Sequence, residues 1–434
     1  MMDPVALGTI GVGCMLGLLG LGVPIAFALA FIGTLGYVFM AGWQPAIAQL
    51  SLIAFDKGTD FVMVCVPLFI LMGQLVLHTN LASDLYFCLQ TWVGRLRGGL
   101  AIASVGACGG FGAVTGSSAA CVATMASIIM PEMRRYKYSD RLASGVLAAS
   151  GTLGILIPPS LGFVFYGILT DTSIGDLFIA GIVPGVLTIL LYCGSIYIRV
   201  LVNPDLAPRG PRYTYRQRLS SLRGLIPILI VFVLVIGGLY GGVFTPTEGA
   251  GIGVAGVCLV SLAMRRISIE RIKRALYETG VLSAMIFAII IGGYMLARFL
   301  ALTQITQSMI DIVVAMKMGR VSFIIAMILV YLILGMMLDI FGMLVLSIPF
   351  FFPVTLSMGI DPVWFGVFVV IMTEIAMVTP PIGTNVFILK TIVPDIPMSE
   401  VFKGIIWFTV CDLSLVFLLI VFPQIALWLP RLGR

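Results

Sequence analysis

The residues whose types and spacing could do chemistry fall into two pairs of segments. The first pair is a glycine- and hydroxyl-rich stretch at 109–120 and a helix-breaking stretch at 151–160, which contains Pro158-Pro159. Proline removes a backbone donor and disfavours helix at the preceding residue, so carbonyl groups near Ile157 lose their partners. Free carbonyls and Ser or Thr hydroxyls are hard oxygen ligands, which a small cation would satisfy. For this pair alone, a plain proline kink with close helix packing is the alternative.

The second pair of segments repeats the design further along the chain. It consists of 337–343, which holds Asp339 and Gly342, and 374–385, which holds Pro380-Pro381. At such breaks the N-terminus of a half-helix offers N–H groups to an anion, and a C-terminus offers carbonyls to a cation. Together the two pairs favour a cation-coupled pocket for an anionic or polar solute over two unrelated kinks.

Ionisable residues inside the apolar stretches are few. They are Asp339, Glu374, Asp412 and Arg298. Each is a candidate for function, because placing a charge in lipid costs at least about 2.5 kcal/mol. The alternative is pairing or capping inside a helix bundle. His78, the single histidine, lies at the end of an apolar stretch, where an interfacial position is favoured over a proton relay.

The composition requires a membrane protein. The 434 residues are 60% hydrophobic and only 10% charged, and the mean hydropathy is +1.15, whereas soluble domains carry about 25% charge. At about 20 residues per crossing, the chain has room for roughly ten to twelve spans and no sizeable extramembrane domain. The eight cysteines lack metal-binding spacing, and the N-terminus has no basic region, so we expect no cleaved signal peptide.

Long apolar stretches predict transmembrane helices and two re-entrant hairpins. Two blocks, 98–133 and 321–357, are too long for one crossing and carry Gly, Ser or Asp near their middles, so we interpret each as a hairpin. Segments 82–97 and 303–320 look like amphipathic interfacial arms. The predicted spans are 5–21, 24–41, 62–78, 142–170, 177–202, 224–242, 249–264, 280–302, 362–392 and 402–430.

The basic residues predict the orientation in the membrane. Five segments hold nineteen of the 25 Lys and Arg residues, and they are 95–97, 134–141, 199–223, 265–274 and 390–403. Because short cytoplasmic loops are rich in Lys and Arg, these segments should be cytoplasmic and explain the net charge of +6 without nucleic-acid binding. The first hairpin would then enter and leave from the cytoplasm, the second from the opposite face, and both termini would lie outside.

An internal repeat underlies this topology. A shift of about 222 to 226 positions aligns Pro158-Pro159 with Pro380-Pro381, Gly116 with Gly342, and Asp176-Leu177-Phe178 with Glu400-Val401-Phe402. The predicted fold is an all-α polytopic membrane protein with two inverted repeats, each of about five transmembrane helices plus one re-entrant hairpin. Inverted repeats with matching helix breaks are typical of secondary transporters. A channel would need a continuous polar stripe, and an enzyme would need positioned acid–base or metal groups, so neither class is favoured.

At these residues the chain resembles the large membrane (permease) subunit of the tripartite ATP-independent periplasmic (TRAP) transporters. The motifs that carry the resemblance are 22–27, 116–120, 154–160, 245–250 and 379–385. The resemblance implies an elevator-type ion-transporter fold and sodium-coupled import of a small organic anion, a carboxylate or sulfonate, across the bacterial inner membrane. It also implies a small four-helix membrane subunit, expected as a separate polypeptide, and a periplasmic solute-binding protein. The alternative is a stand-alone sodium/dicarboxylate symporter of related architecture.

The resemblance also implies a set of site residues. One sodium ion would lie at the first hairpin tip and the first break, and a second at the corresponding elements of the other half, with the substrate between the tips. For the first sodium ion the residues are Gly112, Thr115, Ser117, Gly154, Ile157 and Pro158; for the second, Ile340, Gly342, Thr379 and Gly383; for the substrate, Ser118, Ser160, Thr384 and Asn385.

The chain is expected to divide into five parts. The transport domain would combine 98–170 with the hairpin and break of 303–393, which also holds the second arm. The scaffold would comprise 1–97, and the remaining helices with their basic loops would be 171–302. The last helix would be 394–434.

Overall fold

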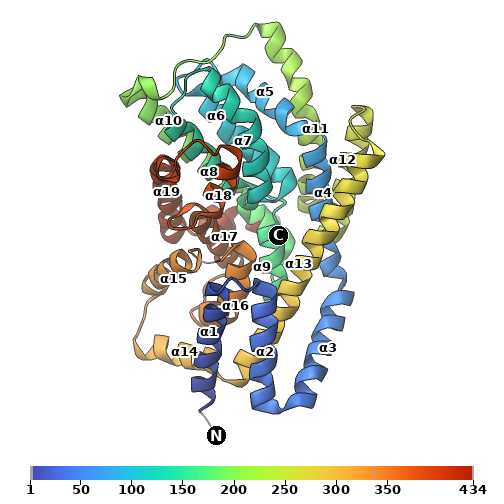
Figure 1. Cartoon of the computed structure of the whole chain (residues 1–434), viewed down its shortest axis with the longest axis vertical. Helices are drawn as coiled ribbons and strands as arrows, with labels where there is room; N and C mark the ends of the chain where they lie inside the picture. The colour runs from blue at the N-terminus through green and yellow to red at the C-terminus, as the bar shows by residue number, and fades with distance from the viewer. Residues whose placement is uncertain (1–2, 337, 433–434) are drawn as a thin grey trace.

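The computed structural model describes residues 3–336 and 338–432, so Met337 of the second tip motif lies outside the described residues. All regular elements in this part of the chain are helices (Figure 1). The first ten are α1 (Pro4–Gly20), α2 (Ile25–Ala41), α3 (Trp43–Thr59), α4 (Cys65–His78), α5 (Leu81–Val93), α6 (Gly99–Thr115), α7 (Ser118–Arg135), α8 (Asp140–Leu156), α9 (Leu161–Thr170) and α10 (Ile174–Val202).

The second half of the chain is also helical. Its helices are α11 (Tyr215–Tyr240), α12 (Pro246–Ala263), α13 (Ile269–Leu302), α14 (Ile305–Ala315), α15 (Arg320–Leu334), α16 (Ile340–Ser357), α17 (Pro362–Val378), α18 (Thr384–Ile392), α19 (Met398–Val421) and α20 (Gln424–Leu432). Seven helical stretches are long and apolar enough to cross a membrane, and the bent pair α8–α9 makes an eighth. The prediction of an all-α polytopic membrane protein is confirmed.

Both predicted hairpins are present. In the first, α6 and α7 meet at Gly116-Ser117, and the Leu100 backbone N–H donates to the Tyr138 hydroxyl at 3.2 Å, which ties the two open ends together. In the second, the open ends of α15 and α16 are also joined, because the Arg320 guanidinium donates to the carbonyls of Met358 and Gly359 at 3.0 and 3.1 Å. Figure 1 shows α6 and α7 in the upper half of the molecule and α14 and α16 in the lower half.

Both predicted helix breaks are also present. The helices α8 and α9 are bent by 43° at residues 157–160, and α17 and α18 are separated by residues 379–383. The peptide bonds Pro158-Pro159 and Pro380-Pro381 are cis. Ile157 and Thr379, which precede the proline pairs, have extended backbone conformations, as expected before proline.

The basic loops gather at one end of the molecule. The Gly210 N–H donates to the Gly94 carbonyl at 3.1 Å, and the Ser139 N–H donates to the Leu206 carbonyl at 3.0 Å. Arg266, which follows α12, pairs with Asp84 of the arm helix α5. The open end of the first hairpin therefore lies at the basic end. The inverted-repeat symmetry and the sliding motion stay predictions.

Two elements differ from the sequence-based expectation. Residues 42–61, which lie between two predicted spans, contain the helix α3. Its apolar side chains, among them the exposed Trp43 and Phe55, are interrupted by polar residues such as Asp56 and Lys57, so the sequence did not predict it. The span expected over 402–430 ends at Val421. Pro423 lies two residues further on, and the helix α20 begins at Gln424.

Candidate functional site

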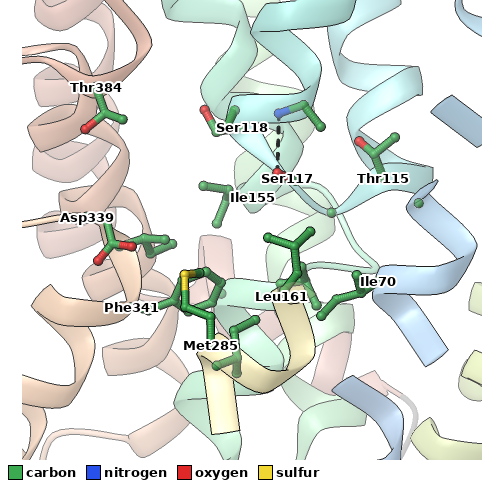
Figure 2. A pocket seen from close by; sticks show the side chains of 18 of the residues that line it. Ile70, Thr115, Ser117, Ser118, Ile155, Leu161, Met285, Asp339, Phe341 and Thr384 are labelled. Carbon is green, nitrogen blue, oxygen red and sulfur yellow. Dashed lines mark hydrogen bonds between the residues drawn. The ribbon is translucent and has the colours of Figure 1, made fainter. Parts of the chain in front are cut away.

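A buried cavity lies where the two hairpin tips meet the helices α4 and α13. Its volume is about 220 Å³. Figure 2 shows Ser117, Ser118 and Thr115 approaching it from the first hairpin and Asp339 and Thr384 from the second half of the chain. The opposite side is formed by Ile70, Gly73, Gln74 and Leu77 of α4 and by Leu282, Met285 and Ile286 of α13.

The first tip brings two helix ends together. Gly116 adopts a left-handed conformation with φ of +60°, which ends α6, and a Cβ there would lie 3.2 Å from the Pro159 carbonyl oxygen. Ser117 then caps α7, because its hydroxyl accepts a hydrogen bond from the Ala120 N–H at 3.4 Å (Figure 2). The tip therefore presents carbonyls from α6 and N–H groups from α7 to the same space.

A direct bond links the two halves of the chain beside the cavity. The Ser118 Oγ donates to Asn385 Oδ1 at 3.0 Å and accepts from Asn385 Nδ2 at 2.7 Å, and Nδ2 also donates to the Ala148 carbonyl at 3.1 Å. Both side chains are buried. The first hairpin tip is therefore fastened to the second broken helix.

The four predicted substrate residues have different surroundings in the structure. Ser118 and Thr384 line the cavity, whereas Asn385 points into the contact with Ser118. Ser160 is buried as the N-cap of α9, and its hydroxyl also donates to the Ile155 carbonyl. The roles of all four residues in binding stay predictions.

The residues predicted for the first sodium ion lie at one helix crossing. A Cβ on Gly112 would lie 2.4 Å from the Gly154 Cα, and a Cβ on Gly154 would lie 3.0 Å from the Ser117 carbonyl oxygen, so the tip touches α8 just before its break. The Thr115 hydroxyl donates to the Phe111 carbonyl at 3.1 Å, and Ile157 and Pro158 form the break itself. Hydroxyl and carbonyl oxygens are the donors that a hard cation prefers, so this set fits sodium.

The residues predicted for the second sodium ion lie at the second tip and at the second helix break. Asp339 caps α16 by accepting from the Gly342 N–H at 2.9 Å, and Ile340 lines the cavity beside it. The Thr379 hydroxyl donates to the Ile375 carbonyl at 2.5 Å at the end of α17. Gly383 begins α18 with a φ of +58°. This set also offers hydroxyl and carbonyl oxygens.

Sequence reasoning missed the contribution of α4 and α13 to the cavity. A Cβ on Gly73 would lie 2.7 Å from the Thr115 carbonyl oxygen, so α4 packs directly on the tip. Gln74 lines the cavity, and its side-chain Oε1 is shielded from solvent and has no hydrogen-bond partner within residues 3–336 and 338–432. A lone amide side chain within an otherwise apolar predicted span could have marked Gln74 as a candidate cavity residue.

The other ionisable residues of the spans lie away from the cavity. Asp412 accepts hydrogen bonds from the Tyr192 hydroxyl at 2.7 and 2.8 Å, which agrees with the pairing alternative. Glu374 is buried in α17, and its Oε1 has no hydrogen-bond partner among the residues that the structure describes. Arg298 is exposed on α13, and His78 lies 3.0 Å from Glu278.

Charge pairing holds the basic end of the first hairpin. Arg134, near the end of α7, donates to both carboxylate oxygens of Asp140 at 2.9 and 3.1 Å and to Asp395 at 2.5 Å. The hydrogen bond from Arg134 lowers the pKa of the Asp395 carboxyl. The first hairpin is thus tied to the connection that precedes α19.

A multi-pass bundle in which two hairpins and two broken helices surround a buried cavity defines a membrane transporter. Comparison with known proteins identifies its family. The family model described as "Tripartite ATP-independent periplasmic transporter, DctM component" matches residues 12–425. The chain belongs to this family, and it is a TRAP transporter large permease.

Relatives of the chain have different substrates in their names. The C4-dicarboxylate TRAP transporter large permease protein DctM of Pseudomonas aeruginosa is 35% identical over 89% of this chain and 90% of its own length. The ectoine TRAP transporter large permease protein TeaC of Halomonas elongata is 32% identical over 98% and 99%. The sialic acid protein SiaM of Vibrio cholerae is 31% identical over 96% and 97%.

The fold also occurs in a solved structure. The crystal structure of the YdaH transporter of Alcanivorax borkumensis matches with a TM-score of 0.57 and 15% identity. The match covers 89% of this chain and 88% of that chain. At this identity the likeness concerns the fold alone.

Proposed function

We propose that this large permease imports a small organic anion across the bacterial inner membrane, driven by sodium. The observation that carries the proposal is the cavity between the hairpin tips, where hydroxyl groups and helix ends from both halves converge. The relatives are named for C4-dicarboxylates, ectoine and sialic acid, which all carry a carboxylate. A carboxylate is therefore the proposed substrate class.

Sodium coupling is supported by the donor chemistry of the tips and breaks. Oxygen atoms of Thr115, Ser117 and Thr379 lie beside interrupted helices. Residues held at both tips would bind sodium and thereby fix the distance between tip and break. Sodium binding would in this way order the cavity for the substrate.

An elevator motion is supported by how the cavity is built. The hairpins and broken helices are linked by the Ser118–Asn385 contact, whereas α4 and α13 contribute mainly apolar side chains. An apolar boundary offers few directional bonds that would oppose sliding. The transport domain would therefore move past these scaffold helices and carry the bound anion with it.

Two partners complete the proposed system. A periplasmic solute-binding protein would deliver the substrate, and a small four-helix membrane subunit would extend the scaffold. Exposed apolar side chains of α2 and α3, among them Phe31, Phe39 and Phe55, offer a surface for lipid or for such a subunit.

The test is uptake into liposomes that contain the permease, its co-purified membrane subunit and the binding protein. Labelled succinate, ectoine and sialic acid are supplied under an inward sodium gradient. We expect uptake of one of these acids that stops when potassium replaces sodium. Sodium-independent uptake would overturn the coupling, and uptake without the binding protein would favour a stand-alone symporter.

A further inference from the structure

A second cavity lies far from the hairpin tips, on the outer side of α10 and α19 at the basic end. Its volume is about 630 Å³. Both flanking helices are long and apolar enough to span the membrane. The groove is lined by Arg141, Leu191, Gly194, Ser195, Ile198, Arg199, Val202, Asn203, Leu206, Trp407, Val410 and Cys411.

Two guanidinium groups in this groove have nitrogen atoms without partners. Arg141 Nε and Arg199 Nη1 are shielded from solvent, and neither has a hydrogen-bond partner in the described part of the chain. Arg141 uses its Nη2 to donate to the Lys403 carbonyl at 3.4 Å, and Arg199 lies 5.9 Å from the Trp407 ring. Buried donors on a charged group are costly when they stay unpaired, so an anion would stabilise this site.

Acidic residues lie near these two arginines but not within the groove, and Glu400 interacts electrostatically with Arg141. Among residues 3–336 and 338–432, no acidic residue lines the groove and neither arginine forms an ion pair. The nearby acids are engaged, since Glu400 pairs with Lys403 at 2.7 Å and Asp412 accepts from Tyr192. The groove itself therefore presents two guanidinium groups and, among its described lining residues, no carboxylate.

The rest of the groove is apolar and exposed. Ile198, Val202, Trp407 and Val410 are between 50% and 82% exposed, and they lie on the two membrane-spanning helices beside the arginines. A ligand that fits this arrangement has an anionic head and a hydrocarbon tail. A soluble phosphate would meet the charges and leave these side chains uncovered.

We propose that the groove between α10 and α19 binds an anionic phospholipid of the phosphatidylglycerol class. Arg141 and Arg199 hold its phosphate, and an acyl chain lies along Ile198, Val202 and Val410. A zwitterionic lipid would add an amine beside two guanidinium groups, so the site prefers a lipid with net negative charge.

The test is lipid titration of the detergent-purified full chain followed by native mass spectrometry. The probes are phosphatidylglycerol, phosphatidylcholine with the same acyl chains, and inorganic phosphate. The double variant Arg141→Gln/Arg199→Gln should bind phosphatidylglycerol at least about tenfold more weakly. The matched control is Arg212→Gln/Arg216→Gln, which removes the same charge from two exposed positions outside the groove.

A second variant blocks the groove and keeps both arginines. Gly194 lines the groove, and a Cβ there would meet no atom within 4 Å, so Gly194→Phe is chosen to place a ring in the groove. It should reduce phosphatidylglycerol binding while thermal stability and elution volume stay at the wild-type values. The proposal is overturned if both variants bind like the wild type, if phosphatidylcholine binds equally well, or if inorganic phosphate competes.

Discussion

At the scale of single residues, the hydroxyl groups at tip and break decide whether the proposed ion sites exist. Ser117→Ala and Thr379→Ala should each lower the apparent affinity for sodium, because each removes a hydroxyl oxygen from its site. Ser117→Ala should also destabilise the protein by about 1 kcal/mol, since this hydroxyl caps α7. Uptake rate against sodium concentration in liposomes measures the effect.

Ser127→Ala is the matched control for these hydroxyl variants, because Ser127 is exposed on α7 and bonds only the Thr124 carbonyl. Unchanged sodium activation in both Ser117→Ala and Thr379→Ala would contradict the proposed ion sites.

At the scale of elements, the proline pairs define the broken helices. Pro158→Ala/Pro159→Ala should restore helix hydrogen bonds across residues 157–160 and abolish transport. Uptake by purified protein of confirmed fold measures the loss. Pro208→Ala, in an exposed loop, should leave uptake unchanged. Normal uptake by the double variant would show that the break is dispensable.

Close packing between α6 and α8 is the second prediction at this scale. Gly112→Ala places a Cβ 2.4 Å from the Gly154 Cα, and backbone cannot yield as a side-chain end would. The variant should lose about 1–3 kcal/mol of stability through overpacking. Gly280→Ala on α13, where a Cβ meets no atom within 4 Å, should be neutral or stabilising. Equal melting temperatures for both variants would refute the tight crossing.

Part of this arrangement of elements could be predicted from the sequence. Proline pairs and glycine-rich tips are local signals with direct backbone consequences, so both hairpins and both breaks could be predicted. The helix α3 could not, because its apolar side chains are interrupted by polar residues and its exposed face has no internal partner.

The candidate site was predictable only in part, for a different reason. Ser118 and Thr384, which the family resemblance implied, line the cavity at the first tip and after the second break. That Asn385 bonds Ser118, and that Gln74 reaches the cavity from α4, depends on contacts between residues far apart in sequence. Periodicity and residue spacing within one segment do not indicate which distant residues will come into contact.

At the scale of the whole molecule, the Arg134–Asp395 pair predicts the response to acid. Because Arg134 lowers the pKa of Asp395, the pair contributes stability above the unfolded-state pKa of about 3.9, which is lost as the pH falls through the folded-state pKa. Asp395→Asn should therefore be less stable than the wild type at pH 6 and approach it below about pH 4. Thermal unfolding from pH 3 to 7 measures this.

Asp205→Asn serves as the control for that series, because it makes the same change at an exposed carboxyl that forms no ion pair with any described residue. A stability difference between Asp395→Asn and the wild type that stays constant across the pH range would contradict the proposed contribution.

The uneven lining of the central cavity has a mechanistic consequence. Hydroxyls and helix ends come from the hairpin side, whereas α4 and α13 present mostly apolar side chains together with the amide of Gln74. An anionic substrate would find nearly all its hydrogen-bonding partners on the hairpin side of the cavity and would move with that side. Substitutions on α4 and α13 should then change the transport rate more than the affinity for the substrate.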